Sequence, residues 1–455
     1  MGKNMKPSMA LRKGVLALAA LLAAASGGAG AVTLQQAYEA ALKNDPQYRM
    51  RFYEKESTQE NEVLGRSALL PQVSASFGAT RNIADVENLG RTLTGEQVWV
   101  PSTPRYISRS SAIQVRQPIL NLDGIVRYRQ GKVQARQGVK QFESDTNDVI
   151  LRVVGAYADA LFAEDQVDLS RVQRDMYREQ MKVNQYLFDK GEGTKTDTLE
   201  TKARFDLSEA QLVEAQNNAQ AQRDTLAGVI GMDPGPLDKL GADFRFQDVA
   251  PKSFDAWRGI AMARNPQLEA ARLAVENTRL DIQRNRAGHA PRVDFVATYS
   301  KDDAASLQTY QQNSVNRAVG VQVNIPIYQG GAINAQTRQA ADNWNRAQAD
   351  LDNRTSNVMI ELRKSYDLVQ NSVPKINALE KAVVSGKELM TATEQSIKGG
   401  VRINLDLLNA QQQLYVSQRD LAQARYTYLL GLLRLRAAAG TLDEQAVREV
   451  AAYFR

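Results

Sequence analysis

The sequence consists of two similar halves, and this duplication limits the possible folds more than any other feature. Segment 34–47 has the same pattern as segment 254–267, and both end in Pro-Gln. The halves stay aligned further along the chain, where Gly231 corresponds to Gly440 at a spacing of 209 residues. Two Ala/Gln-rich stretches that match by chance would not preserve proline, glycine and aspartate at a nearly constant spacing. We therefore predict two copies of one architecture.

Each half contains two stretches in which apolar and polar residues alternate. Their approximate bounds are 71–82, 109–118, 291–301 and 317–327. In the last stretch, single polar or small residues separate Val319, Val321, Val323 and Ile325. This period of two places the apolar side chains on one face of a strand. The sequence thus predicts one β-hairpin in each half, with long polar connections at 83–108 and 302–316.

A helical pattern follows each hairpin. Residues 121–190 contain no proline, and about 70 residues at 1.5 Å per residue would form a rod of roughly 105 Å. Residues 330–398 repeat this pattern, with Pro374 as a predicted kink or local break. Near the end of the chain a large side chain recurs every seven residues, at Leu407, Leu414, Leu421, Tyr428 and Leu435. This heptad predicts coiled-coil packing with a left-handed supercoil.

These patterns define the predicted fold class. We expect a chain that is mainly α with a small β part, in which each half supplies one β-hairpin and one long antiparallel helical hairpin. The predicted boundaries are 1–31 for a signal peptide, 32–240 for the first repeat with its helical hairpin at 121–231, 241–440 for the second repeat with its helical hairpin at 330–439, and 441–455 for a C-terminal tail.

The N-terminal segment predicts export. An apolar run from Gly14 to Ala25 follows a basic start, and Ala29-Gly30-Ala31 fits a small-x-small cleavage site. This is the pattern of a secretory signal peptide. The alternative, a membrane anchor, would need a longer apolar run than about 12 residues. No later stretch approaches 18 apolar residues, so we expect no transmembrane helix in the mature chain. The exported protein of a Gram-negative bacterium would then be either soluble in the periplasm or inserted in the outer membrane as β-strands.

Composition excludes several classes of function. The chain has no cysteine and a single histidine, His289, so disulfides and metal sites built from several Cys or His ligands are excluded. No phosphate loop or nucleophile elbow is present, and we expect no catalytic residue, no metal and no cofactor. Four of the six excess positive charges belong to the signal peptide, and the mature chain carries 53 basic and 51 acidic residues. This near balance removes the case for nucleic acid as a partner.

Four strands with one apolar face require partners. In lipid, an open sheet would leave the N–H and C=O groups of its edges unpaired, so the sheet has to close. The smallest membrane barrels have eight strands, so a chain that supplies four must at least dimerise, and a trimer would supply twelve. The alternative is a periplasmic sheet covered by the chain's own helices.

With these features, the chain resembles the TolC family of outer-membrane channel proteins over nearly its whole mature length. The duplicated halves and two Gly-x5-Asp turns carry the resemblance, together with prolines at the strand–helix junctions, namely Pro71, Pro291, Pro118 and Pro326. The most specific stretches are Gly400–Gln411, Ala424–Leu430 and Ala438–Leu442.

The resemblance implies a homotrimer that forms a twelve-stranded outer-membrane β-barrel, continued by a twelve-helix periplasmic α-barrel. It also implies docking of a periplasmic adaptor at the turns that contain Gly191, Gly399 and Gly400, and an inner-membrane ABC or proton-driven transporter that supplies energy. Segment 404–410 and the missing lipobox favour the channel of type I protein secretion. The alternatives are the outer-membrane component of a multidrug efflux pump and, more remotely, a periplasmic coiled-coil adaptor.

The resemblance also assigns a gate at the periplasmic end. Thr196 and Asp197 on the first turn would face Arg402 on the second, and a charge-assisted hydrogen bond would hold the mouth closed. Asp406 would belong to an acidic ring that favours cations. The chain departs from the family pattern at Asn409, where a second aspartate is usual, and at an aromatic gate position, which here is Ile397. We therefore expect a weaker cation preference and a differently wired latch; the alternative is that these are solvated turn charges.

Overall fold

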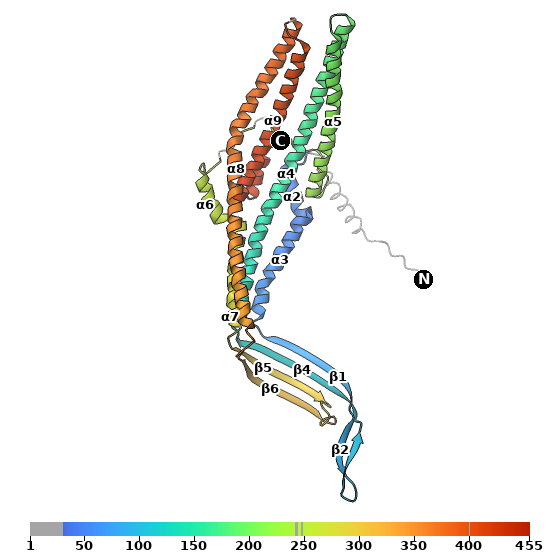
Figure 1. Cartoon of the computed structure of the whole chain (residues 1–455), viewed down its shortest axis with the longest axis vertical. Coiled ribbons are helices and arrows are strands. Elements are labelled where there is room, and N and C mark those ends of the chain that lie inside the picture. The colour runs from blue at the N-terminus through green and yellow to red at the C-terminus, as the bar shows by residue number, and fades with distance from the viewer. Residues whose placement is uncertain (1–30, 242–243, 247–248, 400) are drawn as a thin grey trace, which may run out of the picture. The chain divides into compact units, whose positions relative to one another are not determined.

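The computed structural model describes residues 31–455, except residues 242–243, 247–248 and 400 (Figure 1). All residues of the predicted signal peptide except the last therefore lie outside the described residues. The chain divides into two compact units. One consists of the residues up to Phe52 with Glu143–Asn265 and Ser356–Arg455, and the other consists of Tyr53–Phe142 with Pro266–Thr355.

The second unit contains a four-stranded antiparallel sheet in the order β1-β4-β5-β6. The strands are β1 (Gln72–Ile83), β4 (Arg105–Leu120), β5 (Arg292–Asp303) and β6 (Asn313–Asn324). Val73 lies opposite Val115, which lies opposite Ala297, which lies opposite Val319. The apolar residues of all four strands therefore share one face of the sheet.

The connection between β1 and β4 differs from the expected polar loop. It contains a separate two-stranded ribbon, formed by β2 (Val86–Arg91) and β3 (Gln97–Ser102). Leu89 lies opposite Trp99 in this ribbon, and Val98 and Val100 flank Trp99. Cross-strand pairs of branched and aromatic side chains favour strand pairing, and they explain why this segment is extended.

Helices α3 (Pro46–Ser67) and α7 (Pro266–Ala287) precede β1 and β5, and long helices follow β4 and β6. The backbones of α3 and the start of α4 (Leu122–Asp189) lie in contact, because a Cβ atom on Gly131 would meet the carbonyl oxygen of Asn61. After α7, the His289 Nε2 atom lies 3.2 Å from the Asn334 Oδ1 atom, so this histidine links the end of α7 to the start of α8 (Ala332–Lys398).

The first unit is helical and holds the main apolar core. Besides the larger parts of α4 and α8 (Ala332–Lys398), it contains α2 (Leu34–Asn44), α5 (Lys195–Ile230), α6 (Phe254–Arg264), α9 (Asn404–Ala439) and α10 (Glu444–Ala451). The heptad leucines and Tyr428 of α9 turn inward, and Tyr428 and Leu435 are fully buried. Pro374 lies inside α8, which continues as one helix through it.

Corresponding helices in the two halves have nearly equal lengths. There are 11 residues each in α2 and α6, 22 each in α3 and α7, 36 each in α5 and α9, and 68 and 67 in α4 and α8. Both α5 and α9 end in a left-handed glycine, Gly231 and Gly440. Within the described residues, none of these helices combines the length and apolarity needed to cross a membrane.

Candidate functional site

The first turn of the predicted gate holds its aspartate locally. Thr194 caps α5: its hydroxyl accepts a hydrogen bond from the Asp197 backbone N–H at 3.1 Å and donates one to the Asp197 carboxylate at 2.6 Å. A carboxylate in the first turn also interacts favourably with the helix dipole. Thr196 is exposed beside it, and Gly191 lies in the preceding turn, where its N–H donates to the Phe188 carbonyl.

The second turn joins α8 to α9. The Gly399 N–H donates to the Gln395 carbonyl at 3.1 Å, whereas Gly400 lies outside the described residues. The Arg402 side chain is exposed, and no ion pair joins it to Asp197 among the described residues of the single chain. The assignment of these two residues to a latch therefore remains a prediction.

Asp406 and Asn409 follow on the first turns of α9. Asp406 is half-buried, and Asn409 is exposed. Residues three apart lie on one face of a helix, so these two side chains share a face. The arrangement is compatible with the predicted constriction, which requires neighbouring copies to be complete.

A buried polar cluster between the two helical hairpins was not predicted from the sequence. Thr201 of α5 is 0% exposed, and its hydroxyl accepts hydrogen bonds from the side-chain amides of Asn184 at 2.6 Å and Asn404 at 3.2 Å. Gln180 donates to the Asn404 side-chain oxygen at 2.8 Å and to that of Asn184 at 3.1 Å. The cluster thus joins α4, α5 and the start of α9.

One signal for this cluster was available in the sequence. Thr201 lies seven residues before Ser208, which in turn lies seven before Ala215, and all three are buried. Small residues occupy this buried position of the heptad repeat, and a buried hydroxyl there needs a hydrogen-bond partner. The pattern predicts that Thr201 is buried, but it does not predict which side-chain amides donate hydrogen bonds to its hydroxyl.

The substitution Thr201→Val is expected to destabilise this end of the hairpins by about 1–3 kcal/mol, because it removes the acceptor of two side-chain amides, that of the buried Asn184 and that of the half-buried Asn404. Thermal unfolding of the purified protein measures the loss. The matched control is Thr427→Val on α9, whose hydroxyl only donates to the Gln423 carbonyl of its own helix. Equal melting temperatures for the two variants would show that the cluster contributes nothing.

The contact between α4 and α9 changes character along its length. At its apolar end, Val153, Tyr157 and Leu161 of α4 are buried in the core. Polar contacts follow: the Tyr426 hydroxyl donates to Asp165 at 2.9 Å, Ser170 meets the Tyr415 hydroxyl at 3.1 Å, and the Gln173 amide donates to Gln412 at 2.6 Å. Burial raises the pKa of the Asp165 carboxyl above its usual range.

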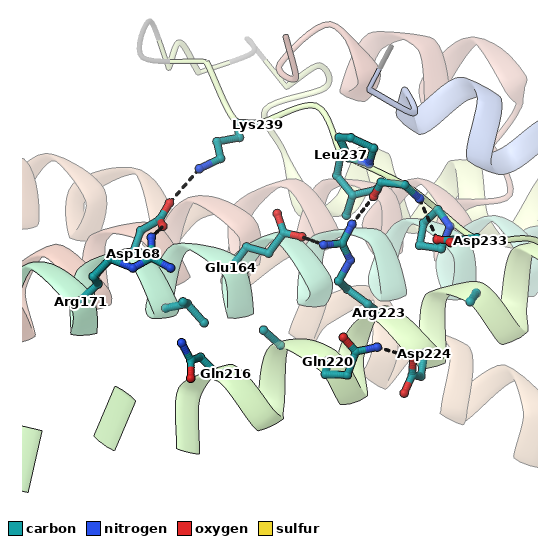
Figure 2. Close-up of a pocket in the computed structure, with 16 residues that line it drawn as sticks. Glu164, Asp168, Arg171, Gln216, Gln220, Arg223, Asp224, Asp233, Leu237 and Lys239 are labelled. Atoms are coloured by element: carbon teal, nitrogen blue, oxygen red, sulfur yellow. Dashed lines mark hydrogen bonds and ion pairs between the residues drawn. The ribbon is translucent and has the colours of Figure 1, made fainter. Parts of the chain in front are cut away.

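An open groove of about 990 Å³ lies along α4 and α5 beside segment 233–239 (Figure 2). Several of its charges are paired with one another: Lys239 contacts Asp168 at 2.8 Å, and Arg223 contacts Glu164 at 3.2 Å and donates to the Gly235 carbonyl. Burial raises the pKa of the Glu164 carboxyl. Among the described residues that line the groove, there is no nucleophile–base pair and no group of side chains that could hold a metal ion.

Comparison with known proteins identifies the family. The profile described as "Outer membrane efflux protein" matches residues 37–232 and 257–441. The chain belongs to this family. It is 38% identical to the alkaline protease secretion protein AprF of Pseudomonas aeruginosa over 93% of this chain and 88% of AprF. It is 36% identical to the proteases secretion protein PrtF of Dickeya chrysanthemi over 98% of this chain and 96% of PrtF.

The TolC resemblance found in the sequence is confirmed by two further comparisons. The outer membrane protein TolC of Vibrio cholerae is 29% identical over 96% of this chain and 97% of TolC. The crystal structure of the outer membrane protein VceC of Vibrio cholerae superposes with a TM-score of 0.75, covers 90% of this chain and 96% of VceC, and shares 17% identity. The chain therefore has the fold of the TolC-like channels and is an outer-membrane channel protein with a periplasmic extension.

Proposed function

We propose that three copies of this family member close their sheets into one twelve-stranded barrel. The sheet edges support this closure. The four strands alternate in direction, and β1 and β6 form the two edges of the four-stranded sheet. When β6 of one copy pairs with β1 of the next, the two strands are again antiparallel, so the ladder closes without an exposed edge.

The two faces of the sheet support a membrane position with a water-filled interior. On one face, Val73, Phe77, Ile113, Val319 and Val321 are exposed to solvent in the single chain. The opposite face is polar and includes Ser74, Gln114, Thr298 and Gln322. Asp294 is buried there between Arg116 and Arg292. Apolar-out and polar-in alternation is typical of membrane barrels with an aqueous lumen.

The long helices are proposed to continue this barrel as a tunnel. Each copy supplies α4, α5, α8 and α9, so three copies supply twelve helices. The matching helix lengths and the two left-handed glycine caps support the interpretation of 32–240 and 241–440 as structural repeats. A chain built in this way is a conduit and not an enzyme.

The exported substrate is proposed to be a protein, in a type I secretion system. The observation that carries this proposal is the similarity to AprF and PrtF, which extends over 88% and 96% of those relatives. A periplasmic adaptor would dock at the turns around Gly191 and Gly399, and an inner-membrane ABC transporter would supply energy. The alternative is a multidrug efflux pump, which the 25% identity to the outer membrane efflux protein BepC of Brucella suis supports less strongly.

Membrane fractionation with heat-modifiable gel migration tests the assembly. The unheated protein is expected in the outer-membrane fraction at the mass of a trimer, and the heated protein at the mass of a monomer. A soluble monomer would overturn the proposal. Deletion of the gene tests the substrate class: loss of a secreted protein from the medium supports type I secretion, and drug sensitivity with normal secretion supports efflux.

The substitution Asp406→Asn is expected to reduce the preference of the channel for cations, because it removes three carboxylates from a narrow ring. The reversal potential under a KCl gradient in planar bilayers measures this preference. Asn409→Asp is the matched control that changes the charge in the opposite direction. It adds three carboxylates on the same helix face and should increase the preference for cations. An unchanged reversal potential in both variants would place these residues away from the pore.

A further inference from the structure

Each strand of the four-stranded sheet carries a cation on the apolar face next to the apolar row. These cations are Arg81 on β1, Arg109 on β4, Lys301 on β5 and Arg317 on β6, and all four are exposed. On β1, β5 and β6 the cation comes next on this face after Ala79, Tyr299 and Val319, which end the unbroken apolar row. On β1 and β6, Ile83 and Val315 lie beyond the cation. On β4, Ser111 intervenes between Ile113 and the cation. On β4, Ile107 also lies beyond the cation, so the four cations border the unbroken part of the apolar band.

The strand register places the four cations on one oblique line. Arg109 lies opposite Ala79, two residues before Arg81; Lys301 lies opposite Ser111, two residues after Arg109; and Arg317 lies opposite Tyr299, two residues before Lys301. Each step moves about 6.6 Å along the strands toward the helical end.

In a barrel with tilted strands, groups at the same depth in the membrane lie on a line that is oblique to the strands. With strands about 4.8 Å apart and tilted by about 40°, a line of constant depth moves roughly 4 Å along the strands at each step. The unbroken apolar row is offset in the same sense, since it ends at Ala79 on β1 but already at Val319 on β6, which is in register with Val73. The remaining spread, roughly 8 Å over four strands, is within the reach of flexible Arg and Lys side chains.

The cations lie at the end of the sheet that is remote from the helices. Helix α3 leads into the start of β1, and the end of β4 leads into α4. Arg81 is near the end of β1, and Arg109 is near the start of β4. The same holds for Lys301 on β5 and Arg317 on β6. With the helices in the periplasm, these cations are at the depth of the outer-leaflet headgroups.

Few acidic groups offset this positive charge. Arg109 forms an ion pair with Asp303 at 3.5 Å, but the two side chains remain 59% and 40% exposed. The Arg317 guanidinium lies 5.7 Å from the centre of the Tyr299 ring. Within the described residues, no ion pair engages Arg81 or Lys301. On this face of the four strands, Arg105 adds a fifth cation, while Asp303 is the single acid.

We infer that Arg81, Arg109, Lys301 and Arg317 bind the phosphate groups of a phosphorylated glycolipid in the outer leaflet. Guanidinium groups bind phosphate through paired N–H donors, and cations beside a lipid-facing band attract anionic headgroups. Continuity with the apolar band favours a lipid, because the acyl chains of the same molecule would cover that band. The inference rests on the proposed trimeric barrel, which would present twelve such cations around its circumference.

The test measures how many molecules of diphosphorylated lipid A remain on the purified trimer in a non-ionic detergent, by native mass spectrometry. The quadruple variant R81Q/R109Q/K301Q/R317Q is expected to lose affinity by roughly fivefold for each cation removed. Monophosphorylated lipid A should bind the wild-type trimer more weakly than the diphosphorylated form, and phosphatidylcholine more weakly still.

Two control variants separate the sheet cations from general charge. K202Q/K364Q/K381Q/K387Q removes four exposed cations from the helices and should retain lipid A. R81K/R109K/K301R/R317K preserves the charge of the line and should also retain it. Equal retention by the quadruple glutamine variant and the wild type overturns the inference.

The wild-type trimer alone provides a second decision if the glutamine variant does not assemble. Stronger retention of diphosphorylated lipid A than of phosphatidylcholine supports the inference, and equal retention overturns it. A wild-type chain that does not migrate as a trimer contradicts the proposed assembly instead, so the two failures are distinguishable.

Discussion

The substitution Gly231→Val is expected to prevent the chain from accumulating as a folded trimer, whereas Gly228→Ala in the same helix is expected to preserve it. Gly231 ends α5 with a φ angle of 69°, and a Cβ atom there would lie 2.5 Å from the Asn44 Cβ atom. A Cβ atom on Gly228 would instead point into open space, with no neighbouring atom within 4 Å. Comparing the two substitutions therefore distinguishes a need for glycine's backbone conformation and small size at Gly231 from a general effect of replacing a glycine in α5.

The expected cost at Gly231 combines two effects. A left-handed conformation costs a non-glycine residue roughly 1–2 kcal/mol, and overpacking costs a further 1–3 kcal/mol or so. Their sum of about 2–5 kcal/mol is a large part of the typical 5–15 kcal/mol stability of a protein. Gly228→Ala should instead gain up to about 1 kcal/mol from helix propensity.

The amount of heat-modifiable trimer in the outer-membrane fraction measures both variants. Gly440→Val is expected to reproduce the loss, because Gly440 ends α9 with a φ angle of 71° and a Cβ atom there would meet the Arg264 carbonyl. Normal trimer levels for Gly231→Val would contradict the requirement for glycine at this cap. A loss of trimer in Gly228→Ala would show that any change in α5 is damaging.

The substitution Arg402→Ser is expected to raise the single-channel conductance of the assembled trimer. If Arg402 links to Asp197 of a neighbouring copy, three exposed links of up to about 1 kcal/mol each would favour the closed mouth by up to about 3 kcal/mol. Their loss would shift the ratio of open to closed mouths by up to roughly 150-fold. Recordings in planar bilayers measure the change.

Matched variants test whether charge at this position or contact with Asp197 matters. Lys195→Ser removes an exposed cation from the neighbouring turn and should leave conductance unchanged. Asp197→Asn should raise conductance, and combining it with Arg402→Ser should add little, because the two changes break the same link. Unchanged conductance in an assembled Arg402→Ser trimer would remove Arg402 from the gate.

The sequence predicted the long elements well because their signals are periodic. The alternation around Val319 and the heptad through Leu435 identify the buried or lipid-facing positions, and the structure places strands and helices there. The predicted helix 121–190 is observed as Leu122–Asp189. These patterns depend on local spacing, which a single sequence contains in full.

Contacts between distant residues were not predictable in the same way. Thr201 meets Asn404, about 200 residues later, through side chains that are usually solvated. Asn44 donates to the Ile230 carbonyl, and this proximity explains the need for Gly231. The ribbon of β2 and β3 was missed because its apolar pattern is short and interrupted by Gly90. The predicted gate stays a prediction, because contacts with neighbouring copies would be needed to form it.

The even number of strands in the sheet has a consequence for how the assembly is counted. Because β1 and β6 run in opposite directions, any number of copies can be joined edge to edge without a parallel pair. Eight, twelve or sixteen strands would all satisfy the hydrogen-bonding rule. In the proposed barrel, the sheet requires closure but does not set the copy number. We expect the helices to set it, because their packing angles would determine how sharply each copy turns toward the next.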